Sequence, residues 1–224
     1  MAATIRSVNV GTPRAWSWAG IGRSAIEKHP VAGPVRVATL GLEGDQVGDT
    51  VHHGGVDQAV YAFAREDLDE WAERLGAPIS DGMFGENLTT AGLDVNEALI
   101  GERWRVGDVL LEVASVRIPC NDFKCWMGET GFDNTGWVKR FAAVGRPGPY
   151  LRVLQEGTLQ AGDALAVVHR PAHDVTVSTM FRALTTDRSL LPELLQVEGL
   201  VAEARRAVEK YVASAASAVR PGRA

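Results

Sequence analysis

Residues 103–120 read RWRVGDVLLEVASVRIPC, two short apolar runs joined by a turn. The runs 103–106 and 109–116 are rich in valine and leucine and flank the turn pair Gly107-Asp108, which is the pattern of a β-hairpin. Proline cannot donate a hydrogen bond to a neighbouring strand, so Pro119 ends the second run and leaves Cys120 at the rim of a sheet. This stretch predicts a mainly β protein with a thiol at a sheet edge.

Outward from the hairpin, apolar or alternating runs bounded by turn residues predict further short strands. They cover residues 5–10, 35–40, 59–63, 87–90, 151–155 and 164–169. Many short strands of this kind suit a closed or partly open β-barrel with a few helices. One helix is expected to interrupt the strands, over residues 65–75, because Leu68, Trp71 and Leu75 recur at helical spacing.

The character of the chain changes near Pro171. The chain has 24 glycines, of which only Gly199 and Gly222 follow residue 171. Helical patterns cover residues 177–184, 190–196 and 200–212, and helices this short need to pack on one another to be stable. We therefore expect a β-barrel domain over residues 1–171 and a small three-helix module with a frayed tail over residues 172–224.

The composition excludes several classes of protein. Lys and Arg number 23 against 28 Asp and Glu, a formal charge of −5, so a basic surface for nucleic acid is not expected. No apolar run approaches the roughly 18 residues of a membrane helix. Residues 1–16 lack the pattern of a secretory signal, so Cys120 and Cys125 are expected to be reduced thiols of a cytoplasmic protein. The oligomeric state is not indicated by the sequence.

Two glycine-rich loops follow the predicted strand 35–40. Residues 41–45 read GLEGD and residues 52–59 read HHGGVDQA. Glycines let the backbone approach a ligand closely, while Asp45, His52 and His53 supply charge and proton donors. Tight turns and backbone caps use the same residue types, so a purely structural role is the alternative.

Two further clusters contain polar or reactive side chains beside predicted strands. Residues 84–90 read FGENLTT, in which Glu86 and Asn87 precede a strand. Asn87 can hydrogen-bond a heterocycle through its amide, or it can form a local turn. The guanidinium of Arg117, three residues from Cys120, favours a thiolate that suits a nucleophile or a soft-metal ligand. A small buried apolar role for Cys120 is the alternative.

Taken in order, these motifs resemble the MOSC domain, named after the C-terminal domain of molybdenum-cofactor sulfurase. The matching pieces are Lys28-His29-Pro30-Val31, Gly41-Leu42-Glu43-Gly44-Asp45, His53-Gly54-Gly55 with Asp57, residues 84–93, and Arg117-Ile118-Pro119-Cys120. The helices that begin after Asp174 resemble the three-helix extension of stand-alone bacterial MOSC proteins linked to 6-N-hydroxylaminopurine resistance. Two departures are Val56, where relatives often carry proline, and the additional His52, which leaves open which histidine faces the site.

The resemblance implies that the barrel binds a molybdenum cofactor (molybdopterin), with Cys120 as the ligand of the metal. A thiolate suits a molybdenum ion that also carries the two dithiolene sulfurs of the pterin. The candidate proton donors or positioning groups are Asp45, His53 and Glu86. The candidate cofactor-binding residues are Lys28, Arg36, Gly54, Gly55, Asn87 and Arg117.

The expected activity is the reduction of N-hydroxylated bases or related N-hydroxylated small molecules, a molybdenum-dependent oxidoreductase reaction. A separate reductase is expected to supply the electrons, because two cysteines are too few for an iron–sulfur cluster and no G-x-G-x-x-G motif follows a strand. Two alternatives stay open. One is a non-catalytic carrier of the cofactor or of sulfur. The other is a hydrolase or transferase with Cys120 as nucleophile and His53 as base, which requires the two to lie within hydrogen-bond reach.

Overall fold

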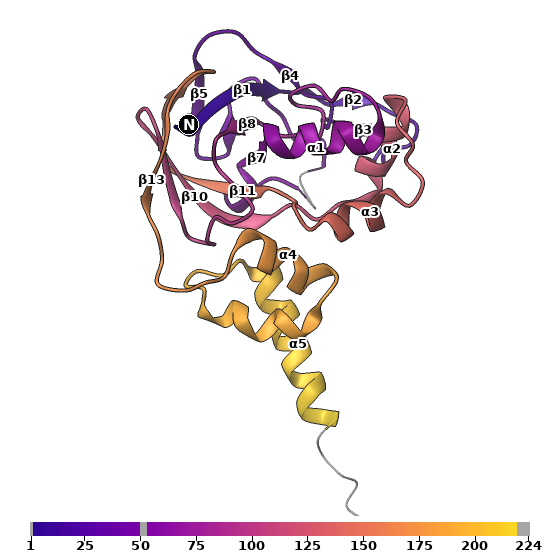
Figure 1. Ribbon diagram of the computed structural model, residues 1–224, viewed down its shortest axis with the longest axis vertical. Coiled ribbons are helices and arrows are strands. Elements are labelled where there is room, and N and C mark those ends of the chain that lie inside the picture. Colours follow the sequence, from indigo (N-terminus) through magenta and orange to yellow (C-terminus); the bar gives the residue numbers. More distant parts are fainter. Residues whose placement is uncertain (1, 50–52, 219–224) are drawn as a thin grey trace, which may run out of the picture.

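The computed structural model describes residues 2–49 and 53–218, with side chains described up to residue 215. Eight strands form one mixed sheet in the order β13-β9-β10-β11-β7-β8-β1-β4 (Figure 1). The pairs are antiparallel except β7 with β8. The strands are β1 (Thr4–Val10), β4 (His29–Pro30), β7 (Val60–Ala64), β8 (Leu88–Ala91), β9 (Arg103–Val106), β10 (Val109–Val116), β11 (Pro149–Gln155) and β13 (Leu165–His169).

The large sheet curls until its two ends approach each other. Thr4 of β1 forms an isolated antiparallel bridge with Ala164, and the Leu165 N–H donates to the Ala3 carbonyl at 2.9 Å. Because this contact is an isolated bridge and no full strand pair is formed there, the sheet is a partly open barrel, which confirms the expected mainly β class.

Two smaller sheets complete the β structure. One contains β12 (Gly157–Leu159), β5 (Val35–Ala38) and β6 (Gly41–Leu42), and the other pairs β2 (Arg14–Ala15) with β3 (Arg23–Ser24). Along β5 the side chains alternate, so that Val35 and Val37 are buried while Arg36 between them is exposed. This alternation directs Arg36 away from the core.

The helices inside the barrel region are more numerous than expected. The helix α1 (Arg65–Leu75) has the predicted bounds, but α2 (Asn121–Glu129) and α3 (Trp137–Val144) were not predicted, and a short 3-10 turn, η1, covers Val56–Gln58. The expectation of a single helix is therefore wrong. An aromatic cluster binds α2 to α3, with the rings of Phe123 and Trp137 at a centroid distance of 5.3 Å.

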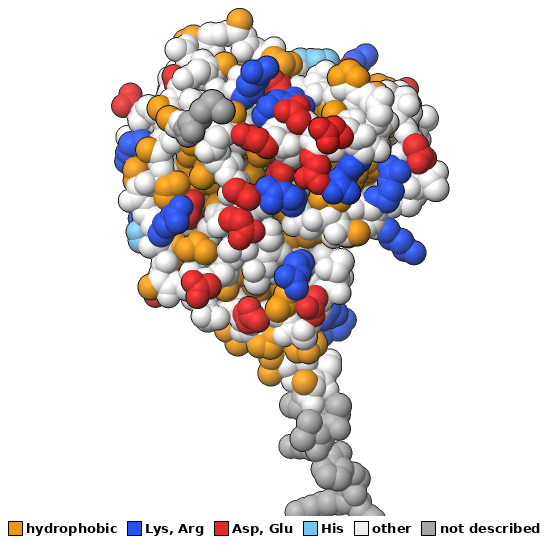
Figure 2. All heavy atoms as spheres, in the orientation of Figure 1, with side chains coloured by type: hydrophobic (Ala, Val, Ile, Leu, Met, Phe, Trp, Pro, Cys, Tyr) orange, Lys and Arg blue, Asp and Glu red, His pale blue; other side chains and the backbone are white. Residues whose placement is uncertain are grey.

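The surface over α1 has mixed charge. Figure 2 shows acidic and basic side chains interspersed there, and Arg65 pairs with Asp69 and Arg74 with Glu70, each one helical turn apart. None of the helices in residues 2–49 and 53–218 combines the length and apolarity that crossing a membrane requires.

After residue 171 the chain forms α4 (Val177–Thr185), the 3-10 helix η2 (Arg188–Gln196) and α5 (Ala202–Ala218). These three helices lie below the barrel in Figure 1, and α5 projects away from it. The Val177 N–H donates to the Ala98 carbonyl and the Ser178 N–H to the Asn96 carbonyl, both at 2.9 Å, so α4 begins on the barrel itself. Met180 and Phe181 are fully buried in the same apolar core as the barrel side chains. A division into independent domains at residue 171 stays a prediction.

Candidate functional site

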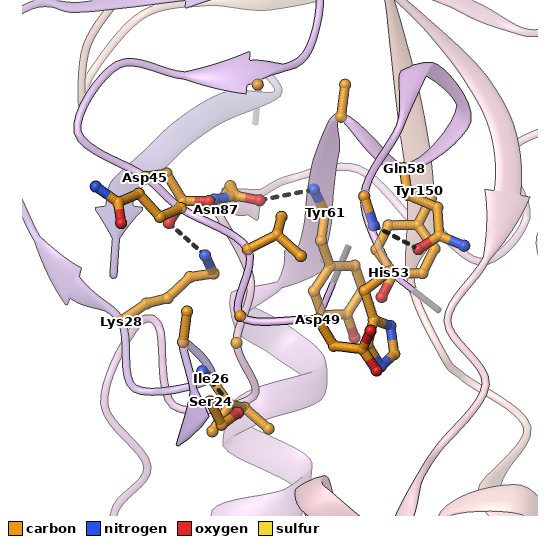
Figure 3. A pocket seen from close by; sticks show the side chains of 18 of the residues that line it. Ser24, Ile26, Lys28, Asp45, Asp49, His53, Gln58, Tyr61, Asn87 and Tyr150 are labelled. Atoms are coloured by element: carbon orange, nitrogen blue, oxygen red, sulfur yellow. Dashed lines mark hydrogen bonds and ion pairs between the residues drawn. The ribbon is translucent and has the colours of Figure 1, made fainter. Parts of the chain in front are cut away.

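The predicted site residues meet around one cavity of about 140 Å³, which we call the inner pocket. It lies where the loop after β6, the loop before β8 and the segment after β10 converge. Seven of the residues singled out in the sequence line it: Lys28, Asp45, His53, Gly54, Asn87, Arg117 and Cys120. In the view of Figure 3, Lys28 and Asp45 lie on one side of Tyr61, and His53, Gln58 and Tyr150 lie on the other.

Cys120 lies between β10 and α2, at the N-cap position of the helix and with extended backbone. Burial alone would raise the pKa of the Cys120 thiol. A hydrogen bond with His53 and the positive charge of Arg117 outweigh burial and lower the pKa to about 7. A substantial fraction of Cys120 is therefore thiolate at neutral pH.

Asp45 is held in place by three donors. Its Oδ1 atom accepts a hydrogen bond from the Gly11 N–H at 2.7 Å and forms an ion pair with the Lys28 ammonium. Its Oδ2 atom accepts from the Asn87 amide at 2.8 Å. The Lys28 and Asp45 side chains are only 9% and 10% exposed, and burial lowers the pKa of Lys28 while Asp45 opposes that shift. The pair is a fixed feature of the pocket wall.

Asn87 connects Asp45 to the sheet. Its Oδ1 atom accepts a hydrogen bond from the Tyr61 N–H at 3.0 Å, drawn as a dashed line in Figure 3, and its amide donates to Asp45 and to the Asn9 carbonyl. The side chain thus uses both ends of its amide within the protein. Asn87 is a positioning residue for Asp45, and the structure does not leave it free to bind a heterocycle.

Glu86 lies behind the wall of the inner pocket and does not line it. Its carboxylate is fully buried and accepts hydrogen bonds from Gly82 N–H, Phe84 N–H and the Thr89 hydroxyl at 2.6, 3.0 and 2.9 Å. Burial outweighs these bonds and raises the pKa of Glu86 to about 7. Gly82 has φ +86°, and a Cβ there would lie 2.8 Å from the Lys28 carbonyl. Glu86 therefore holds the loop that contains Gly82, and the backbone of Lys28 packs against this loop.

Arg117 is a buried cation in the pocket wall. It is 7% exposed and donates to the Phe84 carbonyl at 3.1 Å. Its guanidinium carbon lies 4.5 Å from the ring centroid of Phe123 and 5.2 Å from that of Tyr61. Two aromatic faces thus hold the charge near Cys120.

Two of the expected cofactor-binding residues, Arg36 and Gly55, do not line the inner pocket. The Arg36 guanidinium binds Glu156 at 3.1 Å on the surface, because the alternation along β5 turns it outward. Gly55 is exposed and precedes η1 without lining the pocket, while Asp57 of the same motif accepts a hydrogen bond from Arg152 at 2.8 Å. His53 is the described histidine that contacts Cys120, and His52 lies outside the described residues.

A second and larger cavity, of about 660 Å³, adjoins the inner pocket, and we call it the outer cavity. Both cavities are lined by Asp49, His53, Gln58, Cys120, Asp122 and Tyr150. Cys120 therefore lies at their junction. Within the described parts of the chain, no group of three or more His, Cys, Asp or Glu side chains could hold a metal ion.

Two tyrosines were missed by the sequence reasoning. Tyr61 on β7 pairs in register with Tyr150 on β11, and Gly148 allows this close approach because a Cβ there would lie 2.3 Å from the Ala62 carbonyl. Burial raises the pKa of Tyr150, with Arg117 opposing, so its phenol is neutral at physiological pH. No motif of the sequence marks either tyrosine, although Tyr61 closely follows the second glycine-rich loop.

Comparison with known proteins gives consistent matches. The family model of the MOSC domain matches residues 49–166. "Uncharacterized protein YflK" of Bacillus subtilis is 31% identical over 202 residues, covering 90% of this chain and 88% of the relative. A protein named "Reductase" from Gibberella moniliformis is 33% identical over 181 residues, which is 78% of this chain but 31% of that longer protein. The crystal structure of YiiM from Geobacillus stearothermophilus superposes with a TM-score of 0.76 at 28% identity, covering 93% of this chain and 98% of that one.

Proposed function

The chain belongs to the MOSC domain family, and on that premise we propose that it binds a molybdenum cofactor and reduces N-hydroxylated bases or related N-hydroxylated compounds. The observation that carries this proposal is the Cys120 thiol, whose pKa is lowered to about 7 and which lies at the junction of two cavities. The relative named a reductase supports the oxidoreductase class.

The donor set of the inner pocket fits such a cofactor. A thiolate is a soft ligand that suits molybdenum bound to dithiolene sulfurs, and Cys120 would be that ligand. Arg23, Lys28 and Arg117 line the same pocket and would hold the anionic phosphate of the pterin. Arg23 has an exposed side chain, so it can meet a phosphate more readily than Lys28, which is paired with Asp45.

The proposed net reaction converts R–NHOH, two electrons and two protons into R–NH₂ and water. When bound, the molybdenum cofactor supplies the oxygen-abstracting and electron-transferring chemistry. The protein's own groups supply protons and orientation. His53 is exposed to solvent and hydrogen-bonds Cys120, so it can pass protons from water to the site. Tyr150, whose phenol is neutral because burial raises its pKa, lines both cavities.

Asp45 and Glu86 have different roles from those expected of proton donors. Asp45 is engaged by Gly11, Lys28 and Asn87, and Glu86 lies behind the wall. Both therefore act as positioning residues. The electrons come from a separate reductase in this proposal, since the chain has two cysteines.

A second candidate function has one observation in its favour. The hydrogen bond between Cys120 and His53 meets the geometric requirement of a thiol hydrolase or transferase, in which His53 is the base. The two candidates predict different requirements, because a thiol hydrolase needs neither metal nor electrons.

The test is purification of the full-length chain from a host that makes the molybdenum cofactor, followed by elemental analysis and an assay with 6-N-hydroxylaminopurine. We expect stoichiometric molybdenum, turnover with a reduced viologen dye or an added reductase, and negligible turnover with NADH or NADPH alone. Stoichiometric molybdenum without turnover would support a carrier of the cofactor. Absence of molybdenum together with thiol-dependent hydrolysis of an activated ester would support the second candidate.

A further inference from the structure

One acidic residue of the second glycine-rich loop has no role in the lining of the cavities. Asp57 follows His53 by four residues, but its side chain lines neither the inner pocket nor the outer cavity. It lies in η1 beside Gln58, which lines both. The Asp57 carboxylate is directed toward β11 of the large sheet, where it meets the guanidinium of Arg152.

Arg152 joins η1 to the sheet. Its Nε and Nη2 atoms donate to Asp57 Oδ1 at 2.8 and 2.6 Å, and its Nη1 atom donates to Glu112 Oε1 at 2.6 Å. Glu112 is the cross-strand neighbour of Arg152 on β10, and its other oxygen accepts from Arg103 Nε at 2.9 Å. The donors of a guanidinium form a rigid planar fork, so contacts on both sides fix the orientation of Arg152.

The loop before η1 is hinged at two glycines. Gly54 and Gly55 have φ of +81° and +80°, a region that glycine adopts at little cost. Because glycine is also free to adopt other torsions, these two positions do not by themselves fix the place of His53. The Gly54 N–H donates to Gln58 Oε1 at 3.2 Å, which ties the hinge to η1. The position of His53 therefore depends on where η1 is held.

The strand β11 connects this anchor to the site. Side chains two residues apart on a strand lie on the same face, so Tyr150 and Arg152 share one face of β11 while Leu151 is in the core. Tyr150 lines both cavities. The loop that Arg152 anchors contains His53, which hydrogen-bonds Cys120. One strand thus places both a phenol and an imidazole relative to the thiol.

We propose that Arg152 is a positioning residue of the site. By fixing η1 on the sheet, it keeps the preceding loop where His53 contacts Cys120. The inference rests on the proposed function for the reaction that His53 serves, whereas the contact itself is measurable without a cofactor. Arg152 lines neither cavity, so its replacement leaves the lining side chains in place and changes how the loop is held. The alternative is that Arg152 only stabilises the sheet through its ion pair with Glu112.

The first test is amide hydrogen exchange in the full-length chain, with Arg152→Gln compared with Arg103→Gln. Both variants remove one positive charge and one bond to Glu112, but of the two arginines Arg152 alone also bonds Asp57. We expect the amides of residues 53–58 to exchange about tenfold or more faster in Arg152→Gln and at the wild-type rate in Arg103→Gln. Equal exchange in the two variants would overturn the inference.

The second test measures the contact with the thiol. The imidazole ¹⁵N chemical shifts of His53 report whether a ring nitrogen is hydrogen-bonded, and Cys120→Ala supplies their values without the contact. In Arg152→Gln the shifts should move toward those of Cys120→Ala, and in Arg103→Gln they should stay at the wild-type values. A purely stabilising role of Arg152 predicts no movement in either variant, and that result would also overturn the inference.

A second variant keeps both tests decisive if Arg152→Gln fails to fold. Asp57→Asn weakens the ion pair from the loop side and leaves the bond between Arg152 and Glu112 in place. It should produce the same two changes to a smaller extent, because the amide oxygen of asparagine still accepts a hydrogen bond. Wild-type exchange and wild-type shifts in a folded Asp57→Asn variant would overturn the inference.

The last measurement concerns turnover. In the enzyme loaded with the molybdenum cofactor, Arg152→Gln should lower kcat for 6-N-hydroxylaminopurine several-fold at unchanged molybdenum content, because a displaced His53 delivers protons less well. An unchanged kcat would overturn the part of the inference that concerns the reaction. If the loaded wild type reduces nothing, the proposed activity fails, while the exchange and chemical-shift data still decide the role of Arg152.

Discussion

The inner pocket and the outer cavity share Cys120 but are constructed in opposite ways. The polar side chains of the inner pocket are bound to one another: Asp45 has three donors and Asn87 uses both ends of its amide. The lining of the outer cavity includes exposed or half-buried apolar side chains, such as Ile21 and Leu184, which cannot form hydrogen bonds, together with the exposed Glu203 and Arg206 of α5. Substitutions in the inner pocket should therefore alter stability and chemistry, and substitutions in the outer cavity should alter selectivity.

The largest effect is expected where the two cavities meet. Cys120→Ser replaces the thiol with a harder, nearly isosteric ligand. Mutation of a residue that only hydrogen-bonds a metal ligand lowers activity by up to roughly 100-fold. We expect the loss of the ligand itself to lower molybdenum-dependent turnover by more than that. Steady-state assays of the loaded enzyme measure the loss, and an unchanged melting temperature shows that the fold persists. Cys125→Ser, which is outside both cavities, is the control. Full activity of the Cys120 variant would show that Cys120 is not the ligand of the metal.

The next largest effect is on stability, where a buried ion pair of the inner pocket is compared with an exposed ion pair elsewhere. Asp45→Ala leaves the buried Lys28 without its partner, and removal of one member of a buried ion pair costs about 3–5 kcal/mol. Glu70→Ala breaks an exposed pair with Arg74, where we expect roughly 0.5 kcal/mol or less. Urea unfolding at pH 7 measures both free energies of unfolding. Similar small losses for the two variants would contradict the view that the pocket wall is fixed by Asp45.

A smaller effect concerns the ionisation of Cys120. Its lowered pKa means that the thiolate, the form that iodoacetamide alkylates, becomes dominant as the pH rises through about 7. In a Cys125→Ser background the alkylation rate should rise with that midpoint. His53→Gln weakens the stabilisation of the thiolate and should move the midpoint upward by about one pH unit. His29→Gln, an exposed histidine paired with Glu27, should leave it in place. An unchanged midpoint in the His53 variant would show that the contact between His53 and Cys120 does not lower the pKa of the thiol.

The smallest effect lies outside both cavities. Arg36→Ala should leave the molybdenum content per chain unchanged and cost roughly 0.5 kcal/mol or less, because its exposed ion pair with Glu156 contributes little. Arg117→Ala, in the pocket wall, should lower the molybdenum content. Elemental analysis of both variants makes the comparison. Loss of molybdenum in the Arg36 variant would mean that the cofactor reaches beyond the inner pocket.

The strands and the position of the thiol could be predicted because their signals are local. The bounds of β9 and β10 follow from two apolar runs and the Gly107-Asp108 turn, and Pro119 marks the rim where Cys120 lies. The outward direction of Arg36 was also present in the sequence, in the alternation with Val35 and Val37. The charge of Arg36 suits a phosphate, but its position on β5 directs it away from the inner pocket.

Other features depend on contacts between distant residues. The helices α2 and α3 are stabilised by Phe123, Trp137 and Phe141, whose rings pack on one another. Each helix is so short that its apolar residues do not repeat over enough turns to mark a helix in the sequence. The engagement of Asn87 by Asp45 joins positions 42 residues apart. The outer cavity combines residues near 20, 118, 184 and 203, and no local pattern brings these together.

The backbone hydrogen bonds from Val177 and Ser178 to the barrel have a consequence for dynamics. Because these N–H groups are bonded to the Ala98 and Asn96 carbonyls, the helical wall of the outer cavity cannot swing away without breaking barrel-side bonds. Their amide protons should therefore resist deuterium exchange about as well as those of the sheet. A ligand bound in the outer cavity should add protection from exchange along α4, because Met180 and Leu184 of this helix line the cavity.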